Sequence, residues 1–224
     1  GPLPLGLQVA DIAGGSLHAV IGILAAVVQR QTSGRGQLVD IGMTDCAFTL
    51  NAMAGAAALA GGVDAQPETT LLNGGSFYDY YRTADDRYLA VGSLEPQFMQ
   101  ALAQAIGQPQ IAGLGLAQDA ATQAQLKQTL RDALSRKTLA EWQTVFAGVD
   151  ACVEPVLSLS EAALQPHAQA RNWVVQVPVP GGSSQAQTAC PLKFSAADLQ
   201  YRNTGGPVGE HTQQVLAELA AITQ

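Results

Sequence analysis

The feature that most restricts the fold is a long apolar helix without a solvated face, expected over residues 10–29. Its apolar side chains recur at helical spacing, and almost no polar residues separate them. A second alanine-rich stretch, residues 44–60, has the same character. Helices of this kind are buried on most sides, so we expect both to lie in a core or an interface. The longest apolar run, residues 17–28, is too short to span a bilayer, so no membrane partner is expected.

Composition narrows the class of protein further. Of the 224 residues, 13% are charged and 47% are hydrophobic, which excludes disorder over most of the chain. The 11 Lys and Arg against 18 Asp and Glu give a net charge of −7 without a basic stripe, so no nucleic-acid partner is expected. Cys46, Cys152 and Cys190 are widely separated and odd in number, which fits neither a disulfide framework nor a zinc site. We therefore expect no bound metal and a reducing compartment, the cytoplasm.

The start of the chain lacks both an initiating Met and the basic region of a signal peptide. We expect either a processed chain or a segment of a longer protein.

The rest of the chain mixes helical and strand patterns, which predicts an α/β fold. Its composition changes at residues 61–72 and again at 175–190, where we place domain boundaries. Strands are expected at 36–41, 76–83, 87–94, 152–157 and 173–179, the second and third forming a hairpin. Helices are expected at 97–106, 124–136, 139–147 and 209–222, with one or two more within 161–171 and a flexible turn at 181–187.

Asp11 is the first candidate for chemistry, because it lies where the long apolar helix begins. One interpretation is a helix cap, a position that Asp favours. The other is a reactive carboxylate, because Gly14 and Gly15 follow at once and two glycines inside a helix each cost about 1 kcal/mol relative to alanine. Such a cost is understandable where a backbone or a ligand must approach closely. Both interpretations remain open at this point.

Two further segments carry candidate residues. Gly74 and Gly75 follow Asn73, a pattern that marks either an ordinary turn or a flexible flap over a ligand. Glu95 ends an expected strand just before a helix that starts with Pro96. It can favour the helix N-terminus through its charge, or it can be a catalytic side chain at a strand end.

These segments, taken in order, resemble CoA-transferase family III, also called the CaiB/BaiF family. Asp11 with Gly14-Gly15-Ser16 is similar to the family's catalytic-aspartate segment. The similarity continues through residues 33–40, the Gly74-Gly75 flap with Tyr-Asp-Tyr-Tyr at 78–81, Glu-Pro-Gln-Phe at 95–98 and Val-Glu-Pro-Val-Leu at 153–157. Within the family, the flap and Glu-Pro-Gln-Phe are most similar to the α-methylacyl-CoA racemases.

The resemblance implies a fold and a partner. Family members form an interlocked homodimer, with a Rossmann-like large domain and a small α/β domain in each subunit. On that template residues 1–65 belong to a partial large domain, 70–175 to the small domain, and 185–224 to the return into the large domain. A catalytic histidine would then lie upstream of residue 1.

The resemblance also implies an activity on acyl-CoA, with the CoA thioester as substrate and no separate cofactor. In a racemase, Asp11 would exchange the α-proton with the upstream histidine, Glu95 would orient that histidine, and the glycines (Gly14, Gly15, Gly74 and Gly75) would approach the substrate. In a CoA-transferase, Asp11 would instead carry CoA as an aspartyl thioester. A third possibility is a catalytically silent scaffold or dimerisation module.

Overall fold

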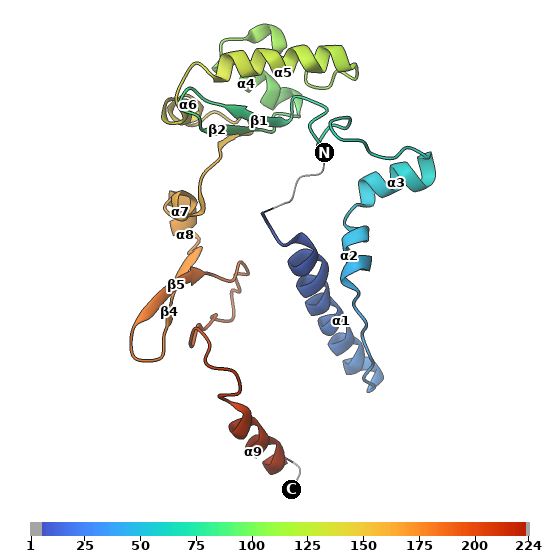
Figure 1. Cartoon of the computed structure of the whole chain (residues 1–224), viewed down its shortest axis with the longest axis vertical. Coiled ribbons are helices and arrows are strands. Elements are labelled where there is room, and N and C mark those ends of the chain that lie inside the picture. Colours follow the sequence, from blue (N-terminus) through green and yellow to red (C-terminus); the bar gives the residue numbers. More distant parts are fainter. Residues whose placement is uncertain (1–5, 223–224) are drawn as a thin grey trace. The chain divides into compact units, whose positions relative to one another are not determined.

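The structure is a computed structural model that describes residues 6–222. It contains two compact units, Gly1–Val156 and Leu157–Gln224, which are described separately below. Helices and two small antiparallel sheets make up the chain, as expected for an α/β protein (Figure 1). The domain limits expected at 1–65, 70–175 and 185–224 refer to the complete family template and stay a prediction.

The first unit begins with the long apolar helix. A π-helical segment, η1 (Val9–Leu17), continues directly into the α-helix α1 (His18–Ser33). The helix stops at Gly34, whose φ of 69° is the left-handed conformation typical of a C-terminal glycine. The expected helix is therefore confirmed, with a wider first part and a later end than its spacing predicted.

The second apolar stretch forms two helices where we expected one. Helix α2 (Met43–Thr49) is separated from α3 (Ala52–Gly61) at Asn51. The Asn51 amide Nδ2 donates to the carbonyl oxygen of Ala47 at 3.0 Å. An asparagine that bonds its own backbone in this way competes with regular helix hydrogen bonds, which explains the break.

The strand expected at residues 36–41 is wrong. No strand forms there within the described residues; instead, Val39 and Ile41 pack against the long helix at Gly22. A Cβ atom added to Gly22 would lie 3.0 Å from Val39 Cγ1 and 3.1 Å from Ile41 Cδ1. The apolar side chains of this segment pack on a helix instead. No strand among residues 6–222 lies beside the segment to bond its backbone.

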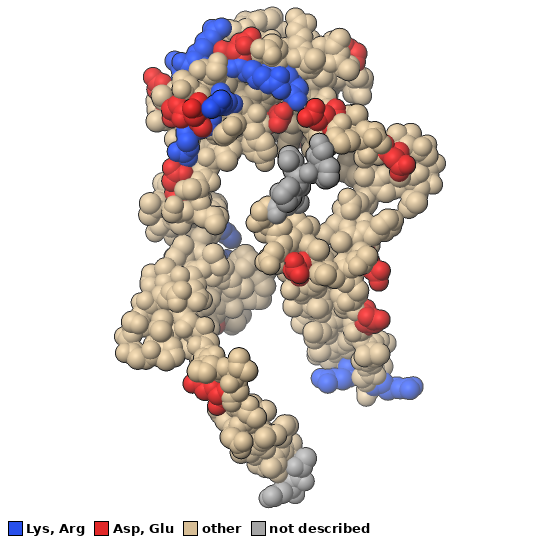
Figure 2. Space-filling view, in the orientation of Figure 1, with Lys and Arg blue, Asp and Glu red and all other residues tan. Residues whose placement is uncertain are grey.

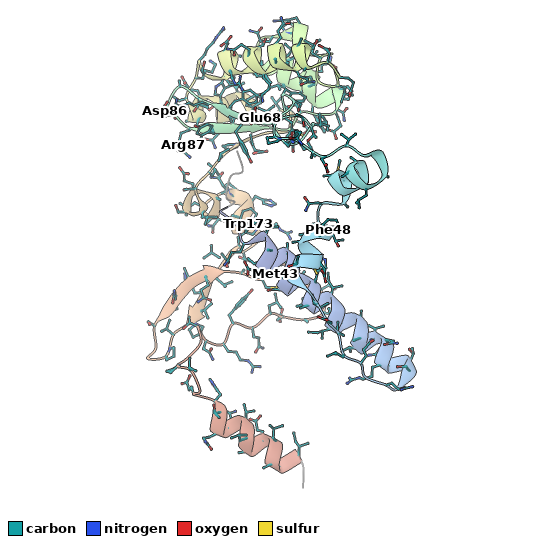
Figure 3. All side chains as sticks on the ribbon, turned by 45° about the vertical axis from the view of Figure 1, so that its right-hand side comes forward. Met43, Phe48, Glu68, Asp86, Arg87 and Trp173 are labelled. Atoms are coloured by element: carbon teal, nitrogen blue, oxygen red, sulfur yellow. The ribbon has the colours of Figure 1, made fainter. Side chains whose placement is uncertain are left out.

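The apolar helices are not buried in a core within the described residues, and burial in an interface stays a prediction. No residue of α1, α2 or α3 is buried, and Ile21 is 62% and Phe48 67% exposed. Few charged side chains cover these helices in Figure 2, and Met43 and Phe48 project from α2 in Figure 3. Only one side of the helix meets α2 and the 39–41 segment, so most of its apolar surface has no cover within the described chain.

The length of this helix also bears on whether the chain could span a membrane. As one helix, Val9–Ser33 spans 25 residues and is long and apolar enough to cross a bilayer by length and composition alone. The 12-residue run was therefore the wrong measure of this helix. A core helix of a soluble protein passes the same test, so the absence of a membrane partner stays a prediction.

The rest of the first unit is an antiparallel sheet packed on helices. Strands β1 (Asp79–Arg82), β2 (Tyr88–Val91) and β3 (Val153–Pro155) lie in the order β1-β2-β3. The helices α4 (Pro96–Ala105), α5 (Ala120–Leu134) and α6 (Leu139–Phe146), with the short η2 (Pro109–Ile111), complete this part. The predicted hairpin, the three helices and the strand expected at 152–157 are thus confirmed.

The core of the first unit lies between the sheet and its helices. Leu89 and Val91 alternate with half-exposed neighbours along β2, so one face of the strand is buried. Helices α4 and α5 cover this part of the sheet in Figure 1. Large side chains that are fully buried here are Phe77, Tyr81, Leu89, Met99, Leu102, Leu126, Leu130 and Leu134.

The second unit contains three short helices and a hairpin. Its elements are α7 (Leu159–Ala163), α8 (Pro166–Ala170), β4 (Val174–Pro178), β5 (Ser184–Thr188) and α9 (Thr212–Ile222). The turn predicted at 181–187 is longer than the turn in the structure. Gly181 and Gly182 make a tight turn with φ of 104° and 94°, and residues 184–188 already pair with β4.

Candidate functional site

Asp11 lies exposed in the first turn of η1. Its backbone oxygen accepts a hydrogen bond from Ser16 Oγ at 3.1 Å, and the oxygen of Ala13 lies 2.6 Å from His18 Nδ1. Because a carbonyl can only accept, the His18 ring carries its proton on Nδ1 in this contact. Both bonds reach five residues back, which suits the wide π-helical turn; such turns are frequent at functional sites.

The two glycines beside Asp11 have different surroundings. Gly14 is buried, and a Cβ there would lie 3.3 Å from the backbone oxygen of Met43 and 3.5 Å from the nitrogen of Ala47. It therefore allows η1 to pack closely against α2. A Cβ on Gly15 would meet only the oxygen of Ala10 at 3.5 Å, an ordinary contact. Of the two glycines, Gly15 rather than Gly14 thus has room for a side chain.

Gly74 and Gly75 belong to a loop that is folded upon itself. Asn73 Oδ1 accepts from the nitrogen of Thr70 at 2.7 Å, and the nitrogen of Gly75 donates to the oxygen of Thr70 at 3.1 Å. Gly74 has a φ of 95°, and a Cβ there would lie 3.2 Å from Cγ of Glu68, which is labelled in Figure 3. The loop needs both glycines for its own backbone, because a Cβ on Gly75 would lie 2.7 Å from the nitrogen and oxygen of Thr70.

Lys127 is a site residue that the sequence argument missed. Its Nζ donates to the oxygen of Gly74 at 2.7 Å and forms an ion pair with Asp79 Oδ2 at 2.9 Å. Lys127 comes from α5, where it adjoins the buried Leu126 and lies four residues after the buried Gln123. A lysine within the apolar stripe of a helix was the available signal, because a partly buried ammonium needs partners.

Glu95 is the residue that precedes α4. Its backbone is extended, and its carbonyl oxygen accepts from the nitrogens of Phe98 and Met99, both at 3.0 Å. The Glu95 side chain is exposed and makes no cap hydrogen bond. Glu95 therefore lies at the helix N-terminus, as the charge interpretation expects, and its carboxylate is not used in a cap hydrogen bond.

Glu95 also contributes to the electrostatics of a neighbouring thiol. Partial desolvation raises the pKa of Cys152, and the negative charges of Asp150, Glu95 and Glu154 raise the pKa further. The thiol consequently stays protonated at neutral pH, which makes Cys152 a poor nucleophile.

In the part of the chain that the structure describes, the segments of Asp11, of Gly74–Gly75 and of Glu95 are not bonded directly to one another. Among residues 6–222, no hydrogen bond or ion pair joins Asp11 to the Gly74–Gly75 loop or to Glu95. The same residues contain no group of three or more His, Cys, Asp or Glu side chains that could hold a metal ion. Lys127 connects the Gly74–Gly75 loop to α5 and to Asp79 at the start of β1.

Comparison with models of protein families shows to which family this chain is related. The model of CoA-transferase family III matches residues 1–212. The chain belongs to CoA-transferase family III.

Several relatives in family III carry names that describe their activity. Alpha-methylacyl-CoA racemase from Mus musculus is 33% identical over 216 residues, which cover 96% of this chain and 55% of the relative. The racemase from Homo sapiens is 32% identical over 227 residues, again 96% of this chain and 55% of the relative. Succinyl-CoA--D-citramalate CoA-transferase from Chloroflexus aurantiacus is 26% identical over 229 residues, which cover 100% of this chain and 56% of the relative. This family III chain thus spans about half the length of these relatives.

Solved structures confirm the family III fold. A CAIB/BAIF family protein from Brucella suis superposes with a TM-score of 0.74 at 22% identity, over 97% of this chain and 57% of that chain. Rv3272 from Mycobacterium tuberculosis superposes with a TM-score of 0.68 at 23% identity, over 95% of this chain and 57% of that chain.

Proposed function

We propose that this chain is part of an acyl-CoA racemase that inverts the α-carbon of 2-methylacyl-CoA thioesters. The observation that carries the proposal is the 32–33% identity to two α-methylacyl-CoA racemases over 96% of the chain. Membership of family III makes a CoA thioester the substrate class. The finer choice of a racemase rests on these two relatives and on the motifs around Asp11 and Glu95.

The reaction needs two acid/base groups on opposite faces of one carbon. The thioester carbonyl acidifies the α-carbon, so one base can remove its proton while the C–H electron pair moves into an enolate. A second group then protonates the opposite face, and the enolate collapses to the inverted thioester with no net oxidation. A positioned acid or base contributes about 10²–10⁴-fold to such a step.

We assign one of these roles to Asp11. Its carboxylate is exposed, and no hydrogen bond or ion pair engages it within the described chain. It can therefore accept a proton from the substrate and return one. The second role falls to the histidine that the resemblance places upstream of residue 1, with Glu95 orienting it. The backbone of the Gly74–Gly75 loop would line the thioester.

The test is isotope exchange in the complete open reading frame that encodes this chain. A single enantiomer of a 2-methylacyl-CoA is incubated in deuterated buffer, and incorporation of deuterium at the α-carbon is followed together with loss of chirality. Asp11→Asn keeps the size of the side chain but removes the base, so the rate should fall about 10²–10⁴-fold. Asp45→Asn is the matched control, because Asp45 is also an exposed carboxylate in the first turn of a helix, α2. Near-native exchange by Asp11→Asn would refute the assignment.

The matches to transferases favour a second candidate, a CoA-transferase. Here an Asp11 oxygen attacks the acyl thioester and expels CoA thiolate, which gives a mixed anhydride. The thiolate then attacks the Asp11 carbonyl, releases the free acid and leaves an aspartyl-CoA thioester. Treatment with acyl-CoA and hydroxylamine would convert Asp11 to a hydroxamate that mass spectrometry detects. A hydroxamate at Asp11 without α-proton exchange selects the transferase.

We also propose that the exposed apolar face of α1, α2 and α3 is covered in an interlocked homodimer. Apolar patches of this extent mark interaction surfaces in soluble proteins. The mass of the protein in solution tests this. Absence of both activities from the complete protein would leave the scaffold role as the function of this surface.

A further inference from the structure

We propose that Lys127 is a positioning residue that holds the Gly74–Gly75 loop in the shape that receives the acyl-CoA thioester. The inference deepens the proposed function and rests on it, because the loop matters for catalysis only if the protein acts on a thioester.

The lysine is placed for this role by its own helix. Gln123, Leu126 and Leu130 of α5 are buried, and Lys127 lies among them with a side chain only 14% exposed. An ammonium group in such surroundings is costly unless it has hydrogen-bond partners. Its two partners are the oxygen of Gly74 at 2.7 Å and the carboxylate of Asp79 at 2.9 Å. The ammonium therefore joins α5, the start of β1 and the glycine loop at a single point.

The loop depends on this contact because its other bonds are internal. Asn73 bonds to Thr70 and Gln66, and Ser76 bonds to Leu71. The hydrogen bond of Lys127 attaches this loop, residues 66–76, to a side chain of α5. Without Lys127 the loop could keep its internal turns but lose its attachment to α5.

The contact also restrains the peptide unit between the two glycines. Its carbonyl oxygen, from Gly74, accepts from Lys127, and its N–H, from Gly75, donates to Thr70. Rotation of this peptide breaks both bonds. A glycine–glycine peptide has little steric resistance to rotation, because neither residue has a Cβ. The ammonium therefore supplies the rigidity that the two glycines lack.

The first experiment measures the loop directly, by hydrogen exchange of the amides in residues 68–76 of this chain. Lys127→Met keeps a similar stem but removes the ammonium, and we expect exchange to be about 10- to 100-fold faster, the loss typical of one hydrogen bond to a charged group. Lys137→Met is the matched control, because Lys137 is exposed and its Nζ lies over the Trp142 ring at 5.8 Å, in the same unit. Lys127→Arg should restore slow exchange. Exchange that is unchanged in Lys127→Met would show that the loop holds itself, and would overturn the proposal.

The second experiment connects the loop to the substrate. In the complete protein, Lys127→Met should raise KM for 2-methylacyl-CoA by about tenfold with a smaller fall in kcat, and Lys127→Arg should reverse most of the change. A faster-exchanging loop with an unchanged KM would overturn the link to the substrate. Failure of the unsubstituted protein to exchange the α-proton would instead refute the proposed function, while the exchange rates of the loop amides would still decide whether Lys127 holds it.

Discussion

Gln123 offers a quantitative test of how the sheet unit supports the glycine loop. Its Oε1 accepts from the nitrogen of Phe77 at 3.0 Å, and its Nε2 donates to the oxygens of Gly115 and Ala117 at 3.0 and 2.8 Å. The side chain is only 6% exposed. One amide thus joins the segment that leaves the loop to the turn before α5. Gln123→Met removes all three bonds with little change in volume.

The expected loss follows from which backbone groups are left without a partner. The bonds to Phe77 and Gly115 are buried, whereas the bond to Ala117 is partly buried and its carbonyl can turn to water. A buried group left unsatisfied costs about 1–3 kcal/mol, and the more apolar Met side chain offsets about 1 kcal/mol. The free energy of unfolding should therefore fall by about 3 kcal/mol.

Urea unfolding followed by tryptophan fluorescence measures this loss. The chain has two tryptophans, and Trp142 is buried in the same unit as Gln123, whereas Trp173 belongs to the second unit. A Trp173→Phe background therefore reports the unfolding of the first unit. Gln125→Met is the control, since Gln125 is exposed on the same helix and should change stability by less than about 0.5 kcal/mol. A loss in Gln123→Met as small as that of the control would refute the reasoning.

Two further predictions follow from the glycine loop and from the apolar helices. Gly75→Ala would place a Cβ 2.7 Å from the backbone nitrogen and oxygen of Thr70, so the loop must open; we expect about 1–3 kcal/mol of destabilisation and faster limited proteolysis within residues 66–76, and unchanged cleavage would contradict this. The exposed face of α1, α2 and α3 predicts self-association, so sedimentation of this chain should give at least twice its 23.2 kDa mass, whereas a stable monomer would contradict the proposed dimer.

Local patterns were enough to predict most helices and the main hairpin. The stop at Gly34 and Pro96 at the start of α4 are local signals, because they act through the φ angle or the missing N–H of a single residue. The order of short motifs around Asp11, Gly74-Gly75 and Glu95 was likewise enough to predict the family, which the family model confirms over residues 1–212. The roles of these residues stay predictions.

The predictions from sequence failed where a residue far away in the chain determines the local structure. The 36–41 segment has the apolar residues of a strand, but Val39 and Ile41 pack on Gly22, and a strand requires a neighbouring strand for its backbone bonds. The partner of Lys127 could not be predicted for the same reason, because Gly74 lies 53 residues away in the chain. Hydrophobic spacing shows at which positions of a helix or strand an apolar side chain occurs. Which surface covers that side chain, and which carbonyl accepts from the partly buried ammonium of Lys127, depends on contacts that only packing in three dimensions creates.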